Sequence, residues 1–352
     1  MGGLPERAGP QSQHQTSAFD RDGSMSASVW EVIAPNLTLL LISLAVFGAV
    51  IYAVFLIGAR ASLKQQEWLR YVVFLGPASL LLLIGLIYPA VRTIVLSLMD
   101  KRSENFIGLD NYIWAFTLPE IQIVLRNTVI WVILVPVVST IVGLAIAYMT
   151  DRMKRGAWVK SLIFMPMAIS FVGASVIWRF MYNFEPNPNK PEIGLLSAIW
   201  RGLGLEPRNW LLEPPLNTLL LIAVMVWIQT GFAMVILGAA MRNIPDEVTE
   251  AAMLDGASNF RRFLRVTLPM IRGTVVVVIT TITIATLKVF DIVRTMTGGN
   301  FQTNIIANEM YSQAFRQLNY GQGSALAVIL FLAVVPIIWY NLRQLRLERS
   351  ER

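Results

Sequence analysis

The stretch LNTLLLIAVMVWIQTGFAMVILGAAM, residues 216–241, decides the fold of this chain. It holds no charged residue and exceeds the roughly 20 residues that an α-helix needs to cross the hydrocarbon core of a bilayer. Because lipid offers no hydrogen bonds to the backbone, such a stretch is stable there only as a helix. It therefore predicts a transmembrane helix, which begins after the turn-forming pair Pro214 and Pro215.

Six further apolar stretches of similar length lie elsewhere in the chain, at residues 37–57, 71–99, 123–149, 159–182, 273–294 and 323–342. We therefore expect an all-α integral membrane protein with about seven transmembrane helices in the lipid bilayer. The composition agrees, because 55% of the residues are apolar and only 14% are charged, too few to cover a soluble protein of this size. Residues 1–36, rich in Gly, Pro, Gln and Ser, are expected to form a disordered tail.

Several classes of function are disfavoured by what the sequence lacks. It has no cysteine and a single histidine, His14, in the polar tail, so metal sites and Cys- or His-based catalysis are not expected. The net charge of +7 is dispersed between apolar runs rather than clustered, which argues against a nucleic-acid partner. No phosphate-binding G-x-x-x-x-G-K-[ST] motif and no catalytic constellation occurs, so the chain is not expected to be an enzyme.

The distribution of Lys and Arg predicts the orientation of the chain in the membrane. Most basic residues fall on one side of the expected spans, and cytoplasmic loops are the ones enriched in them. The basic side holds Arg60, Lys64, Arg70, Arg152, Lys154, Arg155, Lys160, Arg242, Arg261, Arg262, Arg265, Arg272, Arg343, Arg346, Arg349 and Arg352. We therefore expect an outside N-terminus and a cytoplasmic C-terminal tail at residues 344–352.

A polar loop at residues 243–269 lies on the predicted cytoplasmic side. Asn243 or Ile244 is expected to cap a first short helix that opens with Pro245. Gly256 supplies a turn, and Ser258 can cap a second short helix. Pro269 is expected to break that second helix before the next span. The pattern predicts two short helices hinged at a glycine.

This loop resembles the signature of the inner-membrane permeases of binding-protein-dependent ABC importers, which is Glu-Ala-Ala, three residues, Gly, nine residues, Ile, any residue, Leu-Pro. The matching residues here are Glu250, Ala251, Ala252, Gly256, Leu268 and Pro269, with Val266 in place of Ile. The resemblance implies that these residues couple the permease to an ATPase, and that residues 71–343 form a six-helix type I core. Residues 37–57 would then be an extra helix.

The same resemblance implies the partners and the location. It implies a second permease subunit, two ATP-binding-cassette ATPase subunits that bind ATP and Mg, and an extracytoplasmic sugar-binding protein. It places the chain in the bacterial plasma (inner) membrane, with no cofactor bound by this chain itself. A chance match in an ordinary connection between two spans is the alternative, and it is the weaker one because the loop lies on the expected side.

Further motifs resemble the carbohydrate branch of this family. They include Gly108-Leu-Asp-Asn-Tyr112, Asn127-Thr128, Phe290-Asp291, Met296-Thr297-Gly298-Gly299, Ala314-Phe315 and Tyr320-Gly321. Many relatives have Gly-Gly-Pro where this chain has Gly298-Gly299-Asn300. The resemblance implies transport of a carbohydrate. Because Lys288 is the main basic residue expected in the pathway, a neutral di- or oligosaccharide, for example an α-glucoside, is the expected substrate.

Polar residues inside the spans are candidates for the transport pathway, because ionisable groups in a bilayer are costly. Lys288 and Asp291 would share one helical face, where an ion pair and a lining role are equally compatible with the spacing. Gln229 and Phe232 combine an amide with an aromatic ring, as sugar sites do, although packing around Gly231 explains them equally well. The resemblance to maltose-type permeases adds Thr286, whose hydroxyl could instead bond back to its own helix.

Two other functions remain as alternatives. A secondary transporter driven by an ion gradient would explain Asp291 but would leave the loop signature unexplained. An ABC permease for glycerol phosphate or a polyol would keep the loop signature, and a phosphate would favour more basic pathway residues than Lys288 alone.

Overall fold

The computed structural model of the protein describes residues 27–60, 75–151, 153, 156–187 and 189–350. Within these ranges every regular element is helical, and the only β pairing is a single bridge between Met99 and Phe106. The prediction of an all-α protein is confirmed. The chain divides into two compact units, Met1–Pro89 and Ala90–Arg352, which are described separately.

The first unit contains helix α1, Ala27–Arg60, and the beginning of the apolar helical stretch Leu75–Leu96. α1 begins at Ala27 rather than at residue 37, so the expected tail was drawn too long on this side. Apolar residues continue the helical pattern before Pro35, which lies inside the helix. The rest of the expected tail, residues 1–26, lies outside the described residues. In the stretch Leu75–Leu96, the π-helical segment η1, Leu83–Ile87, leads into α3, Tyr88–Leu96.

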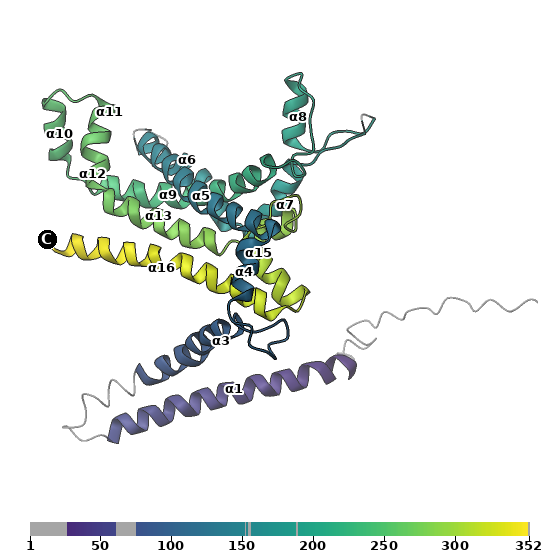
Figure 1. Ribbon diagram of the computed structural model, residues 1–352. Coiled ribbons are helices and arrows are strands. Elements are labelled where there is room, and N and C mark those ends of the chain that lie inside the picture. The colour runs from purple at the N-terminus through teal and green to yellow at the C-terminus, as the bar shows by residue number, and fades with distance from the viewer. Residues whose placement is uncertain (1–26, 61–74, 152, 154–155, 188, 351–352) are drawn as a thin grey trace, which may run out of the picture. The chain divides into compact units, whose positions relative to one another are not determined.

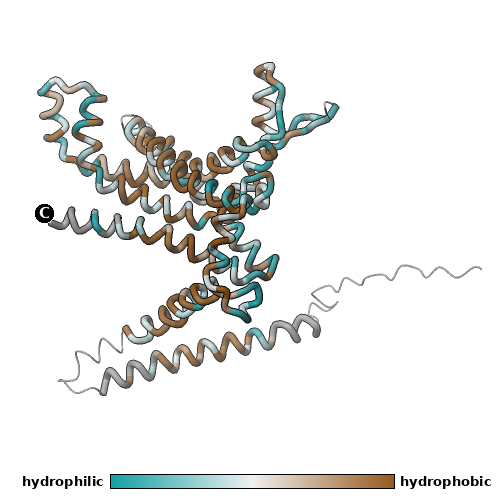
Figure 2. The backbone as a smooth tube through the Cα atoms, viewed as in Figure 1, coloured by the Kyte–Doolittle hydropathy of each residue, from teal (hydrophilic) through white to brown (hydrophobic). Residues whose placement is uncertain are grey.

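The core of the second unit is built by α5, Pro119–Asp151, packed along α9, Leu216–Arg242, with α13, Arg272–Leu287, against both (Figure 1). Figure 2 shows that these helices are hydrophobic over most of their lengths. Gly143 allows the closest approach, because a Cβ atom there would lie 2.6 Å from the Cβ of Ala233. Small residues at a helix contact let two backbones pack tightly, as they do in membrane bundles.

Two of the expected spans are broken helices. The fourth consists of α6, Gly156–Phe164, the 3-10 segment η2, Met165–Ala168, and α7, Phe171–Met181, bent by 105°. The break carries its own cap, because the Ser170 hydroxyl accepts a hydrogen bond from the backbone N–H of Gly173 at 3.1 Å. The expectation of one continuous helix over residues 159–182 was therefore wrong.

The sixth span also departs from the expectation. The helix of residues Asn259–Met270 meets α13 at an angle of 72°, and the break lies at Ile271. Pro269 lies in α12, Leu268–Met270, the last turn of this helix, which ends one residue later at Met270, so the break expected at Pro269 before the next span is confirmed. At its other end the span stops at Leu287, and the separate helix α14, Asp291–Met296, follows.

The described helices provide four straight candidate spans, or six if each bent pair counts as one, together with the N-terminal apolar helix. This agrees with the predicted extra helix and six-helix core. The remaining elements are α4 (Asp110–Thr117), α8 (Leu195–Gly202), α10 (Asp246–Leu254), α11 (Asn259–Arg262), η3 (Phe263–Thr267), α15 (Ile306–Tyr311), η4 (Ser312–Arg316) and α16 (Tyr320–Ser350). Of these, α8 lies in the long connection between α7 and α9.

The second unit has two distinct ends (Figure 1). One end carries α10, α11 and the C-terminal part of α16, and we name it the α10 end. The opposite end carries α4, α7, α14, α15 and the projecting helix α8, and we name it the α15 end. The helices α5, α9, α13 and α16 run between the two.

Candidate functional site

At the α10 end, helices α10 and α11 form the hairpin that the sequence predicts. The backbone turns at Gly256, whose φ of +73° is in the left-handed region that favours glycine. Ser258 caps α11 as expected, because its hydroxyl accepts from the N–H of Arg261 at 3.4 Å. The expected first cap was wrong, since Pro245 is itself the N-cap residue and its extended ψ of 138° makes Asp246 the first helical residue.

The hairpin presents exposed apolar side chains at its tip. Leu254 is 90% exposed, Phe260 is 72% exposed and Met253 is 51% exposed. Of the predicted coupling residues, Glu250, Ala251, Gly256 and Pro269 are exposed, whereas Ala252 and Leu268 are half-buried. Large apolar side chains in a polar loop are costly in water, which indicates a partner protein at this tip.

The hairpin is attached to the end of α5 through Tyr148. The hydroxyl of Tyr148 donates to the carbonyl of Asn259 at 3.2 Å, and its ring lies 4.8 Å from the ring of Phe263 between centroids. Phe263 opens the π-helical segment η3, and such segments are frequent at functional sites. A displacement of the hairpin would thus act on α5 as well as on the two helices that flank the loop. The sequence pattern did not single out Tyr148.

A polar cavity of about 300 Å³ separates the hairpin from the ends of α5 and α9. Asp151 lies beside it and pairs with Arg242 at 3.6 Å and with Lys160 at 3.4 Å. These three side chains are partly exposed, so each pair contributes little to stability. These ion pairs connect the C-terminal ends of α5 and α9 to α6, next to the cavity under the hairpin.

The α15 end carries an unusual turn at residues 297–303, after α14. Four of its residues have positive φ: Gly298 (+67°), Gly299 (+89°), Phe301 (+55°) and Gln302 (+59°). The bulky residue Phe301 is uncommon in this region, and strained residues of this kind persist only where the surroundings hold them. At Gly299 a Cβ atom would lie 2.8 Å from the side chain of Asn304, so no larger residue fits.

Two buried asparagines hold this turn in place. Asn127 on α5 donates to the carbonyls of Gln302 at 2.6 Å and Asn304 at 3.0 Å. Asn217 on α9 donates to the carbonyl of Phe301 at 2.8 Å. Both asparagines are buried, with 1% and 0% exposure, so their hydrogen bonds replace those that water would make. The turn is therefore fixed to both central helices.

Other residues of the carbohydrate-branch motifs also have structural roles at this end. The amide of Asn111 donates to the carbonyls of Ser97 and Met99, at 2.9 and 2.8 Å. The hydroxyl of Thr128 accepts from the N–H of Ile306 at 3.0 Å. At Gly321 an added Cβ would collide with the carbonyl of Met99. These motif residues support the fold of the α15 end.

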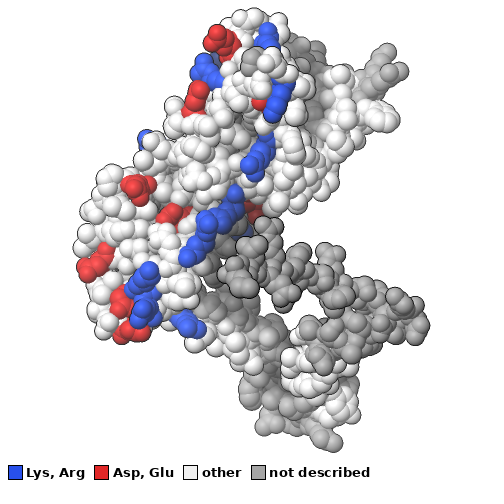
Figure 3. All heavy atoms as spheres, turned by 90° about the vertical axis from the view of Figure 1, so that its right-hand side faces the viewer, with Lys and Arg blue, Asp and Glu red and all other residues white. Residues whose placement is uncertain are grey.

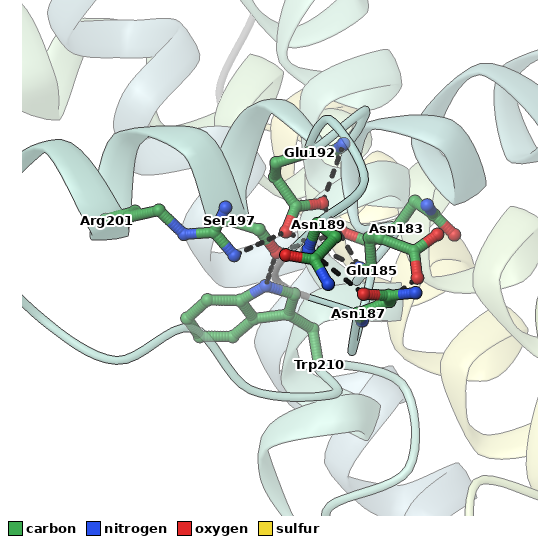
Figure 4. A network of polar contacts seen from close by, with 9 residues as sticks. Asn183, Glu185, Asn187, Asn189, Glu192, Ser197, Arg201 and Trp210 are labelled. Carbon is green, nitrogen blue, oxygen red and sulfur yellow. Dashed lines mark hydrogen bonds and ion pairs between the residues drawn. The ribbon is translucent and has the colours of Figure 1, made fainter.

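A hairpin loop after α7 supports helix α8 through the network drawn in Figure 4. The Ser197 hydroxyl donates to the carbonyl of Asn183 at 2.9 Å and accepts from the indole N–H of Trp210 at 2.8 Å. The carboxylate of Glu192 accepts from the backbone of Glu185 and pairs with Arg201 at 3.4 Å. These contacts fix the loop from which helix α8 projects.

Lys288 and Asp291 do not share one helix as expected. α13 ends at Leu287, Lys288 is its C-cap, and Asp291 is the first residue of α14. Among the described residues no ion pair joins the two side chains. Asp291 instead stands in the first turn of α14, where the positive end of the helix dipole favours a carboxylate. Lys288 is exposed, so it faces water, lipid or a partner subunit.

Three aromatic rings form a column next to this break. The ring of Tyr311 lies 5.0 Å from Phe290 and 5.3 Å from Phe315, and the guanidinium carbon of Arg294 lies 5.1 Å from the Tyr311 ring centroid. Lys288, Phe290 and Tyr311 line a cavity of about 440 Å³ between α13, α15 and α16. The sequence motifs included Phe290 and Phe315 but gave no reason to join them to Tyr311.

The other predicted pathway residues lie deeper in the bundle. Gln229 is buried at 8% exposure, and its amide makes no hydrogen bond to the described part of the chain. Phe232 is half-buried on the same helix. Thr286 is 2% exposed and donates to the carbonyl of Ile282 at 2.7 Å, the back-bonding alternative. The packing expected around Gly231 is also present, since an added Cβ would lie 2.7 Å from the carbonyl oxygen of Ile163.

Comparison with known proteins identifies the family. Residues 121–349 match the family model described as "Binding-protein-dependent transport system inner membrane component". The chain is 48% identical over 280 residues to the "Osmoprotective compounds uptake permease protein GgtC" of Synechocystis sp., covering 80% of this chain and 100% of the relative. It is 46% identical over 298 residues to the "Alpha-glucoside transport system permease protein AglF" of Rhizobium meliloti, covering 84% of this chain and 86% of the relative.

The fold is also similar to that of a solved transporter. A chain of a bacterial ABC transporter for the acidic polysaccharide alginate superposes with a TM-score of 0.68 at 21% identity, covering 80% of this chain and 96% of that chain. The family match, the relatives and the helical architecture agree, and they exclude the secondary-transporter alternative. The chain therefore belongs to the binding-protein-dependent inner membrane components, the multi-pass permease subunits of ABC importers, whose ATPase is a separate subunit.

Proposed function

We propose that this permease moves a neutral α-glucoside, or a closely related di- or oligosaccharide, into the cytoplasm by alternating access. Relatives at 48% and 46% identity carry the names of uptake systems for osmoprotective compounds and for α-glucosides. The more distant relatives include permeases named for trehalose and maltose, and for lactose. A permease named for sn-glycerol-3-phosphate, at 29% identity, makes the phosphate the second candidate.

The aromatic-lined cavity is the structural observation that carries this proposal. Phe290 and Tyr311 offer ring faces, which suit the C–H surfaces of a sugar, while Lys288 offers hydrogen-bond donors. A single exposed amine in an apolar cavity suits a hydroxyl-rich neutral ligand better than a dianionic phosphate, which requires more basic groups. Four further residues complete the proposed pathway. Gln229, Phe232 and Thr286 lie deeper in the bundle, and Asp291 lies across the break between α13 and α14.

The orientation follows from the charge asymmetry of the sequence. The α10 end is cytoplasmic, the α15 end faces outward, and the N-terminus lies outside the cell. In the assembled importer a second permease subunit covers part of the apolar surface, and two ATPase subunits lie below the α10 end. A tag at the N-terminus should therefore be accessible on intact cells, and one at Arg352 only after permeabilisation. Equal accessibility of the two would contradict the orientation.

The hairpin of α10 and α11 is the proposed coupling element. Glu250, Ala251, Ala252 and Gly256 lie on the exposed hairpin, while Leu268 and Pro269 join it to α13. The exposed side chains of Leu254 and Phe260 suit an apolar groove in the ATPase, the mode in which a helix is held by its protruding anchors. Tyr148 would then pass the movement to α5.

Transport by the complete complex tests the substrate proposal. The permease pair, the ATPase and the binding protein are reconstituted together in vesicles, and uptake is measured for an α-glucoside, a β-glucoside, a polyol and glycerol 3-phosphate. We expect ATP-dependent uptake of the α-glucoside and at least about tenfold less of the others, a difference of ~1.4 kcal/mol. Preferred uptake of glycerol 3-phosphate would support the second candidate instead.

A double-mutant cycle tests the pathway role of Lys288 and Asp291. Since no ion pair joins them, the losses in transport caused by Lys288→Ala and Asp291→Ala should add in the double variant, within about 0.5 kcal/mol. A double variant that transports better than either single variant would contradict separate roles. It would indicate that the two charges compensate each other in the assembled complex.

A further inference from the structure

A second polar cavity, of about 480 Å³, opens at the α15 end. Its walls are the last turn of α7, the loop that follows it, and α14 with the fixed turn at residues 297–303. Asn183, Asn209 and Asn300 line it, together with Arg179 and Arg294. No Asp or Glu is among the lining residues.

The two arginines of this cavity lack an acidic partner. No ion pair or side-chain hydrogen bond of Arg179 occurs within the described chain. Arg294 stacks on Tyr311, a contact that fixes its position but leaves the donors at the edge of the guanidinium free. The other arginines of this loop region are paired, Arg201 with Glu192 and Arg208 with Glu213. The cavity therefore holds uncompensated positive charge.

The walls of the cavity are held firmly before any ligand binds. Asn127 and Asn217 fix the turn that contributes Asn300, and Thr297 and Thr303 hydrogen-bond across it at 2.6 Å. On the other side the hydroxyl of Tyr182 donates to the carbonyl of Leu220 at 3.2 Å. A preorganised cavity loses little entropy when a ligand enters, so charged donors here can bind an anion tightly.

We infer that this cavity is a docking socket for an acidic side chain on the extracytoplasmic binding protein. The inference rests on the proposed orientation, which turns the cavity toward the side from which that protein delivers the sugar. The face of the second unit shown in Figure 3 mixes Lys and Arg with Asp and Glu side chains, so the attraction for an acidic side chain is local to the cavity. A bacterial alginate ABC transporter of similar fold, at 20% identity, was crystallised in complex with its periplasmic protein.

The neutral sugar is not the expected occupant. A neutral cargo gains nothing from two uncompensated guanidinium groups, whereas a carboxylate accepts two parallel hydrogen bonds from each. The socket would therefore bind the binding protein, and the aromatic cavity would contact the sugar.

The test uses the full complex in nanodiscs, with ATP hydrolysis measured against the concentration of sugar-loaded binding protein. Arg179→Gln combined with Arg294→Gln should raise the half-maximal concentration about tenfold, and the response should lose much of its dependence on salt. Arg179→Lys with Arg294→Lys keeps the charge and should restore most of the response. Arg208→Gln, which removes a paired arginine outside the cavity, is the matched control and should change the half-maximal concentration less than twofold.

Three results would overturn the inference. The first is an unchanged half-maximal concentration in the double Gln variant that still assembles and keeps its basal hydrolysis. The second is a change only in sugar selectivity, which would assign the cavity to cargo, and the third is a loss that appears only with anionic lipid, which would assign it to headgroups. If the unmodified complex itself ignores loaded binding protein, the proposed function fails, and the socket fails with it.

Discussion

The two ends of the second unit differ in which contacts hold their loops in place. The α10 end is a hairpin made by local signals, the left-handed Gly256 and the Ser258 cap, and it leaves Leu254 and Phe260 in solvent. The turn at the α15 end is strained at Phe301 and depends on Asn127 and on Asn217, which lie far away in the sequence. The hairpin leaves apolar side chains for a partner to cover, whereas the turn at residues 297–303 is held by hydrogen bonds within the chain.

The largest effect is expected from a charge at the hairpin tip. Leu254→Asp should reduce copurification of the ATPase by at least about tenfold, because a carboxylate in an apolar groove loses its hydration without gaining a partner. The stability of the permease should not change, since Leu254 is 90% exposed. Leu109→Asp, at an exposed leucine of the α15 end, is the control and should assemble normally. Equal assembly of both variants would remove the distinction between the ends.

The next largest effect is expected at the fixed turn. Asn127→Ala should lower the free energy of unfolding by about 1–3 kcal/mol, because two carbonyls of the turn lose their buried donor. Thermal unfolding of the detergent-solubilised protein measures this loss. Gln122→Ala removes an amide-to-carbonyl bond from an exposed side chain on the same helix and should cost less than about 0.5 kcal/mol. A similar cost for both would show that the turn does not depend on its buried clamp.

Two glycines with similar backbone conformations test the comparison further, with a smaller expected effect. Gly256 has φ +73° and Gly204, after α8, has φ +75°, and neither has a neighbour within 4 Å of an added Cβ. Gly256→Val and Gly204→Val should therefore suffer the same backbone strain, about 1–2 kcal/mol. Only Gly256→Val should uncouple ATP hydrolysis from uptake. The ratio of the two rates in reconstituted vesicles measures this, and equal uncoupling by both would reduce the effect to strain alone.

The smallest effect is expected at the connection between the hairpin and α5. Tyr148→Phe removes the hydrogen bond to Asn259 and keeps the ring contact with Phe263, so coupled uptake should fall only about two- to fivefold, or ~0.5–1 kcal/mol. Tyr148→Ala removes both contacts and should lower it further. Uptake per ATP hydrolysed is the measurement. Unchanged coupling in the Ala variant would mean that the flanking helices alone carry the movement.

Local patterns in the sequence determined the helical fold and the hairpin of α10 and α11. Apolar runs longer than the bilayer thickness, a glycine at positive φ and a serine cap act within a few residues, so the sequence displays them directly. The same locality explains the errors. The residues around Pro166 and Lys288 do not show whether a span is straight or broken. A break leaves backbone N–H and C=O groups without helical hydrogen bonds, and tertiary packing decides whether other groups can satisfy them.

The tertiary structure alone decided what the polar motif residues and the aromatic rings contact. Asn127 meets Gln302 across a separation of 175 residues, and Phe290 meets Tyr311 only because α15 folds back beside the end of α13. The socket likewise combines Arg179 with Arg294, from helices that are distant in the chain. Such contacts depend on how the helices pack together, and helical periodicity describes only which residues share a face of one helix.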